Sequence, residues 1–318
     1  MKETEPRHEQ ERQITDTVVM ISPDTFGFNP ETANSNSFQK HLNDSPESIR
    51  SMAVLEFNSM VNILKNCGIN VLVIPSRENV ITPDAVFPNN WFSHHQDGSL
   101  VVYPMLAPNR RKEKQIDNLV SCLNEVGMEV KTKDMSFFES EGKALEGTGS
   151  LVLDRANKTA FAIESPRTSK EVFDYWCKNM GYHGVLFHAY DEEDKPIYHT
   201  NVIMGIGEKF TVISLESIKN GSERLLVEKK LTLSGREIVP VTLDQVSSYC
   251  GNVLQLKSTK GDPVIVMSKT SFDAFDARQQ TTLAKYGNIP FINIKTIETI
   301  GGGSARCMVA EIMRSKKT

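Results

Sequence analysis

The sequence predicts an α/β fold in which five related ββαβ units close into a single ring. Three observations predict it. A pattern of two strands, a helix and a third strand recurs along the chain, and the first strands of successive copies are roughly 50–60 residues apart. One copy is also divided between the two ends of the chain, which would join the array into a ring without exposed sheet edges. A plain α/β sandwich of the same elements is the alternative.

Four copies of the unit are continuous in the sequence. The first has two strands in 89–105, joined by an Asp-Gly turn, then a charged helical stretch at 110–127 and a short strand at 128–132. The same order of elements recurs in 149–189, 199–242 and 252–294. The fourth of these copies ends in "IPFINI", which we expect to be its third strand.

The fifth copy is split. Its first strand is "ARCMVAEI" at 305–312, whereas its remaining strand, helix and strand are "TVVMISP", "PESIRSMAVLEFNSMVNILKNCG" and "NVLVIPS" near the N-terminus. Pairing of the two ends would complete the unit. The predicted organisation is therefore a flexible charged tail at 1–16 followed by a single ring domain at 17–318.

Composition excludes several classes of function. The net charge of −4 and pI near 6.0 provide no basic face for nucleic acid, and no apolar run approaches the ~20 residues of a membrane span. The charged N-terminus lacks the apolar core of a signal peptide, so we expect a cytoplasmic protein. Five cysteines without a CxxC pair argue against a disulfide framework and a zinc knuckle. We expect no metal and no cofactor.

In a ring, the corresponding strand starts of all units point at the central axis. Those positions hold Asn90, Glu146, His199, Asn201 and Cys307. Each residue alone has a structural explanation: a lone histidine at a strand start is usually structural, and a buried cysteine usually fills space in a core. Their recurrence at the same phase of successive units instead predicts a common site.

Cys307 follows three successive glycines in "GGGSARCM". Glycines in a row indicate that the backbone approaches another group closely, so the cysteine is either core filler beside a turn or a nucleophile in a tight pocket.

Two neighbouring histidines do not form a candidate metal site. His94 and His95 precede a hairpin turn without a third ligand at metal spacing, and we expect them to be exposed.

The constellation resembles the pentein superfamily of guanidino-group-modifying enzymes, over roughly residues 17–312. The segments "LEGTGS", "YHTN" and "GGGSARCM" are similar to its Glu-Gly-Gly, His-x-Asp and nucleophile motifs. "PDAVFPNNWFS", with "FGFNP" upstream, looks most like the bacterial branch that includes citrulline-utilisation hydrolases. The resemblance implies a catalytic group of Cys307, His199 and Glu146. A free thiol is mostly protonated at neutral pH, so it needs a nearby base or cation, and a carboxylate can orient the imidazole.

Two departures from the family pattern concern the substrate's head group. Related deiminases carry an aspartate where this chain has Asn90 and another where it has Asn201. Loss of two negative charges favours a neutral ureido group, which amides can bind, over a guanidinium. If the register of "FPNN" differs, Asp84 takes the role of Asn90. Succinylarginine dihydrolases also use an asparagine and still take a guanidinium, so both head groups stay open.

Two further segments, "APNRRKE" and "ESPRTS", resemble family segments whose arginines hold a substrate carboxylate. The resemblance assigns this role to Arg110 and Arg167, with Arg111 competing for the first of them. A guanidinium suits a bidentate clamp on an α-carboxylate. Asn29, in "FGFNP", is the candidate for the α-amino end.

These features predict a cysteine-dependent hydrolase that cleaves a C–N bond of a small ureido or guanidino amino acid, with citrulline converted to ornithine, CO2 and ammonia. The alternatives are an arginine deiminase, a dimethylarginine or succinylarginine hydrolase, an amidinotransferase, and a non-catalytic binding factor of the same fold. We expect neither a nucleic-acid nor a membrane partner. The oligomeric state stays open, with a homodimer as one option.

Overall fold

The computed structural model describes residues 11–33, 35–41 and 44–314. Its strands form five small open sheets. In spatial order these are β14 (Ala310–Glu311), β1 (Thr17–Ile21) and β2 (Asn70–Ile74); β3 (Phe92–His94), β4 (Ser99–Val102) and β5 (Lys131–Asp134); β6 (Leu151–Asp154), β7 (Thr159–Ile163) and β8 (His183–Phe187); β9 (Met204–Ile206), β10 (Phe210–Ile213) and β11 (Glu237–Pro240); and β12 (Leu254–Lys257) with β13 (Pro263–Val266).

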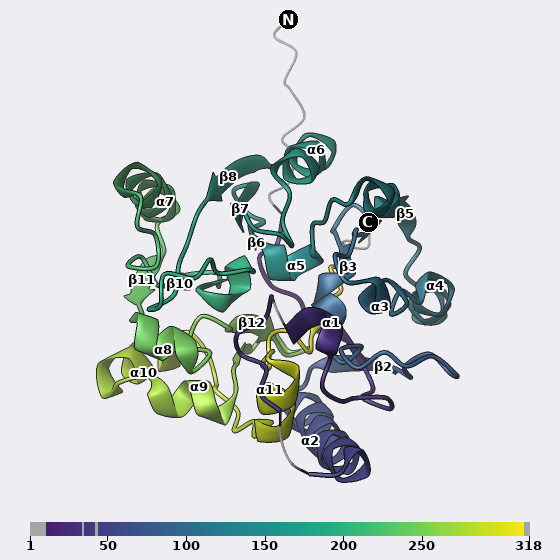
Figure 1. Ribbon diagram of the computed structural model, residues 1–318. Coiled ribbons are helices and arrows are strands. Elements are labelled where there is room, and N and C mark those ends of the chain that lie inside the picture. The colour runs from purple at the N-terminus through teal and green to yellow at the C-terminus, as the bar shows by residue number, and fades with distance from the viewer. Residues whose placement is uncertain (1–10, 34, 42–43, 315–318) are drawn as a thin grey trace, which may run out of the picture.

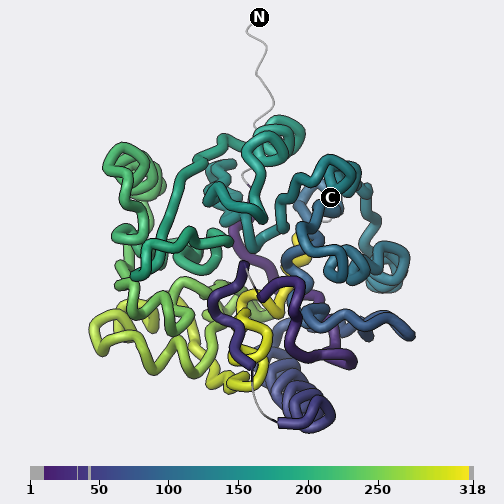
Figure 2. The backbone as a smooth tube through the Cα atoms, viewed as in Figure 1, coloured from purple at the N-terminus to yellow at the C-terminus, as the bar shows by residue number. Residues whose placement is uncertain are grey.

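All the three-stranded sheets share one topology. In each, the middle strand pairs antiparallel with one neighbour and parallel with the other. The split unit predicted from the sequence is confirmed, because β1 pairs antiparallel with β14 and parallel with β2. Figure 2 shows the C-terminal segment, in yellow, near the purple N-terminal segment in the middle of the molecule.

Helices alternate with the strands, and the longer ones lie at the periphery, as α2, α4, α6, α7 and α10 show in Figure 1. Among the described residues, no helix is both long and apolar enough to cross a membrane. The α-helices are α1 (Pro30–Ala33), α2 (Pro46–Asn66), α3 (Pro108–Arg111), α4 (Ile116–Glu125), α5 (Gly147–Ser150), α6 (Lys170–Met180), α7 (Gly221–Leu233), α8 (Leu243–Ser247), α9 (Lys269–Ala274), α10 (Ala277–Ala284) and α11 (Lys295–Gly301).

The longest helix, α2, illustrates how local sequence defines an element. Ser45 caps its N-terminus by accepting a hydrogen bond from Ser48 N, and Pro46 occupies the first turn, where its missing N–H costs nothing. The helix ends at Cys67, before Gly68 with φ +79°. Its buried face recurs at helical spacing and consists of Ile49, Ala53, Phe57, Met60, Val61 and Leu64.

The sheets pack side by side through their inner strands. Strand β14 contacts β3, β6 contacts β9, and β9 contacts β12. One apolar core cluster joins residues of β1 and α2 to residues of β12, β13 and the segment around Cys307. Segments distant in sequence therefore meet around the middle of the molecule (Figure 1).

Three expectations about local structure are wrong. "IPFINI" forms no strand: pairing with β13 is limited to a bridge between Val264 and Asn288, and Pro290 has no N–H to continue it. The predicted strand 305–312 is mostly a turn, in which Cys307 N donates to Ser304 O (2.9 Å), and only β14 is extended. Residues 11–16 pack against the core instead of forming a tail, since Gln13 Nε2 donates to Leu153 O (2.8 Å); residues 1–10 of the predicted tail lie outside the described residues.

The pair His94–His95 is buried, which corrects the expectation of exposure. His94 Nδ1 accepts a hydrogen bond from Met313 N (3.1 Å), and His95 Nε2 bonds to Ser93 Oγ (2.8 Å). Desolvation by burial, with the positive charge of Arg155, lowers the pKa of His94 to about 4 and that of His95 well below its ordinary value. Both rings are therefore neutral in the folded protein at pH 7.

This burial predicts a loss of stability in mild acid. The unfolded chain binds a proton at each histidine below its ordinary pKa of ~6.5, whereas the folded state does not, so stability present above pH 6.5 is lost as the pH falls toward 4. Each histidine contributes a slope of about 1.4 kcal/mol per pH unit. We expect His95→Gln to flatten the pH dependence by that amount between about pH 6 and pH 5. Denaturant unfolding of both proteins at several pH values measures it, and parallel curves would contradict it.

Candidate active site

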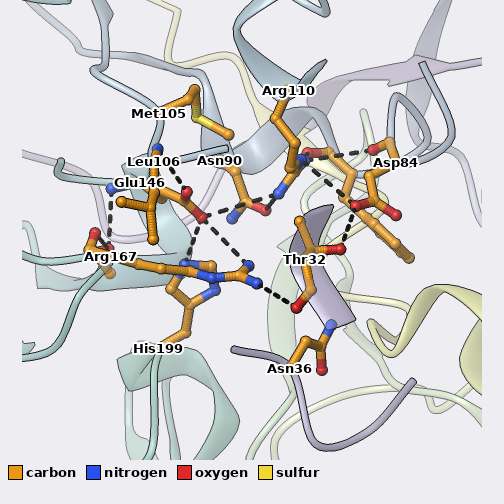
Figure 3. A network of polar contacts seen from close by, with 12 residues as sticks. Thr32, Asn36, Asp84, Asn90, Met105, Leu106, Arg110, Glu146, Arg167 and His199 are labelled. Carbon is orange, nitrogen blue, oxygen red and sulfur yellow. Dashed lines mark hydrogen bonds and ion pairs between the residues drawn. The ribbon is translucent and has the colours of Figure 1, made fainter. Parts of the chain in front are cut away.

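The site residues come from short turns that precede the inner strands. Asn90 ends a 3₁₀ turn (Pro88–Asn90) before β3, Glu146 immediately precedes α5 and β6, and His199 precedes a 3₁₀ turn (Thr200–Val202) before β9. Cys307 lies in the turn before β14. Because the same short turn recurs at each inner strand, side chains from four units reach one region (Figure 3 shows the part around Glu146 and His199).

Glu146 and His199 form the central pair. His199 Nε2 lies 2.9 Å from Glu146 Oε2, and both side chains are buried. Burial alone would raise the pKa of Glu146, but the positive charge of Arg167 and the hydrogen bond from His199 lower it to about 2. Burial lowers the pKa of His199 to about 4 against the opposing effect of Glu146. At neutral pH the pair is a carboxylate with a neutral imidazole.

The protonation of this pair determines which ring nitrogen can act as a base. An ionised carboxylate only accepts, so the proton of the neutral imidazole lies on Nε2 and the lone pair on Nδ1. Nδ1 lies over Gly149: a β-carbon built there would lie 2.8 Å from it and would also collide with Asn90 Nδ2. Glycine therefore allows the imidazole and the Asn90 amide to approach the same point.

Cys307 is bonded to amides from two other units. Asn201 Nδ2 donates to its Sγ at 3.4 Å and Asn252 Nδ2 donates at 3.2 Å. The residue is 9% exposed. Within the described part of the chain, these two amides are the hydrogen-bond partners of the sulfur, and the imidazole of His199 is not among them.

Arg110 is committed to neighbouring protein groups. Its Nε and Nη2 donate to the two carboxylate oxygens of Glu113 at 3.0 and 2.9 Å, and its Nη1 donates to Asn90 Oδ1 at 2.7 Å. Burial disfavours the charge, but the carboxylates of Glu113 and Asp84 raise the pKa of Arg110 overall. The competing Arg111 is turned away, with hydrogen bonds to the carbonyl oxygens of residues 105 and 106.

Arg167 lies on the other side of Glu146. Its Nη1 is 3.5 Å from Glu146 Oε2, its guanidinium lies 4.6 Å from the centre of the Tyr198 ring, and its Nε and Nη2 donate to Ser35 Oγ at 3.2 and 2.7 Å. Ser35 belongs to the N-terminal segment that runs across the site, as Figure 3 shows for its neighbours Thr32 and Asn36. Arg167 thus holds this segment through the Ser35 hydroxyl and through the carbonyl oxygen of Thr32, to which its Nη2 donates at 3.4 Å.

Asp84 and Asn29 lie at the far end of the same network. Asn29 Nδ2 donates to Asp84 Oδ2 at 2.7 Å, and Arg110 Nε lies 3.8 Å from the same oxygen. Burial raises the pKa of Asp84, although Arg110 opposes the shift. Its Oδ1 is buried and has no hydrogen-bond partner among the described residues.

A surface cavity adjoins the site. Its lining includes Phe38, Tyr198 and Tyr249, and the ring centre of Tyr198 lies 4.8 Å from that of His199. Tyr249 and Phe38 have ring centres 5.2 Å apart. The hydroxyl of Tyr198 donates to Asn36 Oδ1 (2.9 Å), so this wall includes the N-terminal segment.

The structure brings the sequence-predicted residues into two groups, one around Glu146 and Arg110 and the other around Cys307. Glu146 links His199 to both arginines, Arg110 links Asn90 to Asp84 and onward to Asn29, and Asn201 contacts Cys307. Sequence reasoning missed Asn252 and Glu113. Asn252 opens the fourth unit at the same phase as Asn90 and Asn201, a signal that could have identified it. Glu113 carried no such signal.

Comparison with known proteins shows the family of this chain. The family model described as N,N dimethylarginine dimethylhydrolase, eukaryotic, matches residues 22–314. No curated protein matches the chain significantly. Among solved structures, the substrate-bound N-terminal domain of ArgZ, a cyanobacterial arginine dihydrolase, aligns with a TM-score of 0.72 at 15% identity, over 94% of this chain and 98% of that chain.

Two other structures show the same fold. AgrE in complex with ornithine and NAD⁺ has a TM-score of 0.72 at 16% identity, over 95% of this chain but only 40% of AgrE. A cysteine-to-serine variant of dimethylarginine dimethylhydrolase (DDAH) from Pseudomonas aeruginosa, complexed with citrulline, has a TM-score of 0.61 at 13% identity, over 94% and 99% of the two chains. The matched family and these neighbours are pentein enzymes, and DDAH and ArgZ hydrolyse guanidino C–N bonds. The chain belongs to the N,N-dimethylarginine dimethylhydrolase family within the pentein superfamily.

Proposed function

We propose that this protein is a cysteine hydrolase that converts citrulline to ornithine, CO2 and ammonia. The observation that carries the proposal is the orientation of the Asn90 amide. Its Oδ1 accepts a hydrogen bond from Arg110, and its buried Nδ2 has no partner within the described residues. The atom that Asn90 offers to a ligand is therefore a donor.

A free donor distinguishes the two head groups. A ureido group has a carbonyl oxygen that accepts a hydrogen bond, whereas a guanidinium has only N–H donors. The amides of Asn201 and Asn252 likewise direct N–H groups toward Cys307, and the carboxylate bonded to His199, that of Glu146, is balanced by Arg167. These N–H donors complement the neutral ureido group of citrulline, whose carbonyl oxygen accepts hydrogen bonds, better than a cationic guanidinium.

The amino-acid end of the substrate would lie near Arg167 and Asp84. The Ser35 hydroxyl that Arg167 binds occupies a position that a substrate carboxylate oxygen can take, and the unpaired Asp84 Oδ1 can accept from an α-ammonium. Asn29 supports Asp84 in this scheme. Arg110 already donates to Glu113 and Asn90, so in this scheme it holds the Asn90 amide in place and does not bind the substrate carboxylate.

The reaction follows from these positions. The proton of the Cys307 thiol passes to His199 Nδ1 as the sulfur adds to the ureido carbon, and the C–N bond to the ornithine nitrogen breaks as Nδ1 delivers this proton to that nitrogen. A carbamoyl thioester remains on Cys307. His199 then takes a proton from water, whose oxygen adds to the same carbon, and the C–S bond breaks. The released carbamate decomposes to CO2 and ammonia, while Glu146 stabilises the imidazolium in both steps.

Incubation of the purified protein with citrulline, arginine and dimethylarginine tests the substrate. We expect ornithine and ammonia from citrulline. A guanidino substrate is the second candidate, favoured by the matched family and by the arginine dihydrolase structures. Conversion of arginine to citrulline, with citrulline itself untouched, would overturn the proposal in favour of a deiminase. The mass of the protein trapped with substrate would separate a carbamoyl from an amidino adduct on Cys307.

The change Asn90→Asp tests the orientation argument directly. The aspartate keeps the oxygen that accepts from Arg110 but replaces the free N–H₂ by an acceptor. We expect kcat/KM for citrulline to fall by about 10²-fold, and the ratio of arginine to citrulline turnover to rise. Asn118→Asp, on the outer helix α4, is the matched control. An unchanged ratio of the two substrates would remove the basis for preferring a ureido group.

The proposal extends to the architecture and setting of the enzyme. We infer that residues 17–318 form a single domain whose five units close into a five-fold pseudosymmetric propeller, supported by the pairing of β1 with β14 and by the contacts of β14 with β3, β6 with β9, and β9 with β12. We place it in the cytoplasm, acting on a free amino acid without a resident cofactor. A crystal structure whose inner strands enclose no common centre would contradict the ring.

A further inference from the structure

We propose that Asn252 is a further catalytic residue, which stabilises the thiolate of Cys307 by donating a hydrogen bond to its sulfur. Asn252 Nδ2 lies 3.2 Å from Cys307 Sγ, and the asparagine is buried with 3% of its surface exposed. The inference rests on the proposed function, because it assumes that Cys307 is the nucleophile.

The orientation of the Asn252 amide is fixed by its other hydrogen bonds. Its Oδ1 accepts from the backbone N–H of Arg306 at 3.0 Å, so the atom facing the sulfur is the nitrogen. Its second N–H reaches the carbonyl oxygen of Asn201 at 3.4 Å. One side chain therefore joins the turn before β9 to the turn that carries Cys307, with both of its amide groups in use.

The backbone next to Asn252 lies very close to the backbone of residues 202–203. A β-carbon on Gly251 would collide with the carbonyl oxygen of Val202 and lie 2.7 Å from Ile203 Cα. Asn252 N also donates to Tyr249 O at 2.9 Å, and Tyr249 adopts a left-handed backbone conformation with φ +65°. Glycine at 251 thus lets this turn press against the β9 unit and brings the amide within reach of the sulfur.

Electrostatics indicates why the sulfur needs such a donor. At neutral pH His199 is uncharged and bonded to Glu146, so it provides no positive charge to a thiolate. A hydrogen bond donated to an ionised acceptor is stronger than one donated to a neutral acceptor and favours the charged form. Asn252 provides this stabilisation without adding charge. Asn201, whose amide has no second side-chain hydrogen bond in the described residues, is free to turn toward the substrate.

Alkylation of Cys307 as a function of pH tests the inference without relying on turnover. Iodoacetamide reacts with thiolates, and peptide mass spectrometry follows Cys307 separately from the other cysteines. Asn252→Leu removes the donor at similar volume, and Asn252→Asp keeps the oxygen that accepts from Arg306 but places a carboxylate oxygen at the sulfur. We expect the midpoint of the labelling curve to move to higher pH by about one unit or more for leucine, and further for aspartate.

Steady-state kinetics and a matched control complete the experiment. We expect kcat/KM to fall by about 10²-fold in Asn252→Leu. Asn288→Asp is the control, because Asn288 contacts the sulfur of Cys67 at the surface, and it should change neither curve. An unchanged midpoint at Cys307 in a folded variant would overturn the inference, and if the leucine variant fails to fold, the isosteric aspartate variant decides. A shifted labelling midpoint in the Asn252 variants, found together with full activity of a separate Cys307→Ser protein, would contradict the proposed function and leave this inference standing.

Discussion

Replacement of Cys307 by serine is expected to lower kcat for citrulline hydrolysis by about 10⁴-fold or more, with the fold intact. A serine hydroxyl is far less acidic than a thiol, and the two amides that contact Sγ cannot make it a nucleophile at neutral pH. No base touches the sulfur in the described structure that could compensate. Initial rates of ornithine formation, together with thermal unfolding, measure the effect.

The control for this prediction is Cys122→Ser, which changes a half-buried cysteine on the outer helix α4. It should retain full activity. Mass spectrometry of the wild-type protein quenched during turnover should show an adduct on Cys307 and none on Cys122. Substantial turnover by Cys307→Ser, or an adduct on another residue, would exclude the covalent mechanism.

The second large effect is expected for Glu146→Gln, which should lower kcat by about 10³–10⁴-fold. Glu146 Oε1 accepts from Leu106 N at 3.1 Å, so glutamine would keep its oxygen there and direct its amide N–H toward His199 Nε2. That nitrogen would then have to accept, and the proton of the imidazole would move to Nδ1. The ring would be held in the tautomer that cannot act as a base toward the substrate.

A pH profile distinguishes this effect from simple loss of structure. Because burial lowers the pKa of His199 to about 4, the acid limb of kcat/KM in the wild-type protein should lie near pH 4 rather than near 6.5. Glu139→Gln, which alters a carboxylate near Lys114, is the control and should keep both rate and profile. An acid limb near pH 6.5, or an active Glu146→Gln protein, would contradict the assignment of His199 and Glu146.

Much of the candidate site was predictable from sequence because the unit repeats. The phase of the repeat predicts that Asn90, Glu146, His199 and Asn201 share a site, and in the structure Glu146 bonds His199. The commitment of Arg110 to Glu113 was not predictable, since it depends on which way a side chain turns within a buried network. Asn252 occupies the matching position in the repeat, but asparagine is common at turns, so its contact with Cys307 Sγ does not follow from that position alone.

The errors in secondary structure have different causes. The missing strand at "IPFINI" follows from Pro290, which has no N–H for a ladder. The turn around Cys307 instead has a partner far away in sequence, because Arg306 N donates to Asn252 Oδ1 at 3.0 Å. The burial of His94 and His95 is similar: Met313 N, which bonds His94, comes from the opposite end of the chain. Sequence periodicity carries no information about such partners.

The pairing of β1 with β14 has a consequence for biosynthesis. During translation, β1 emerges early and waits for its antiparallel neighbour until nearly 300 further residues have been made. The turn carrying Cys307 arrives with that same late strand, so a nascent chain lacks both the edge of its first sheet and its reactive sulfur. Enzymatic competence would therefore appear only after this segment has left the ribosome, and polypeptides truncated before residue 304 would be inert toward substrate.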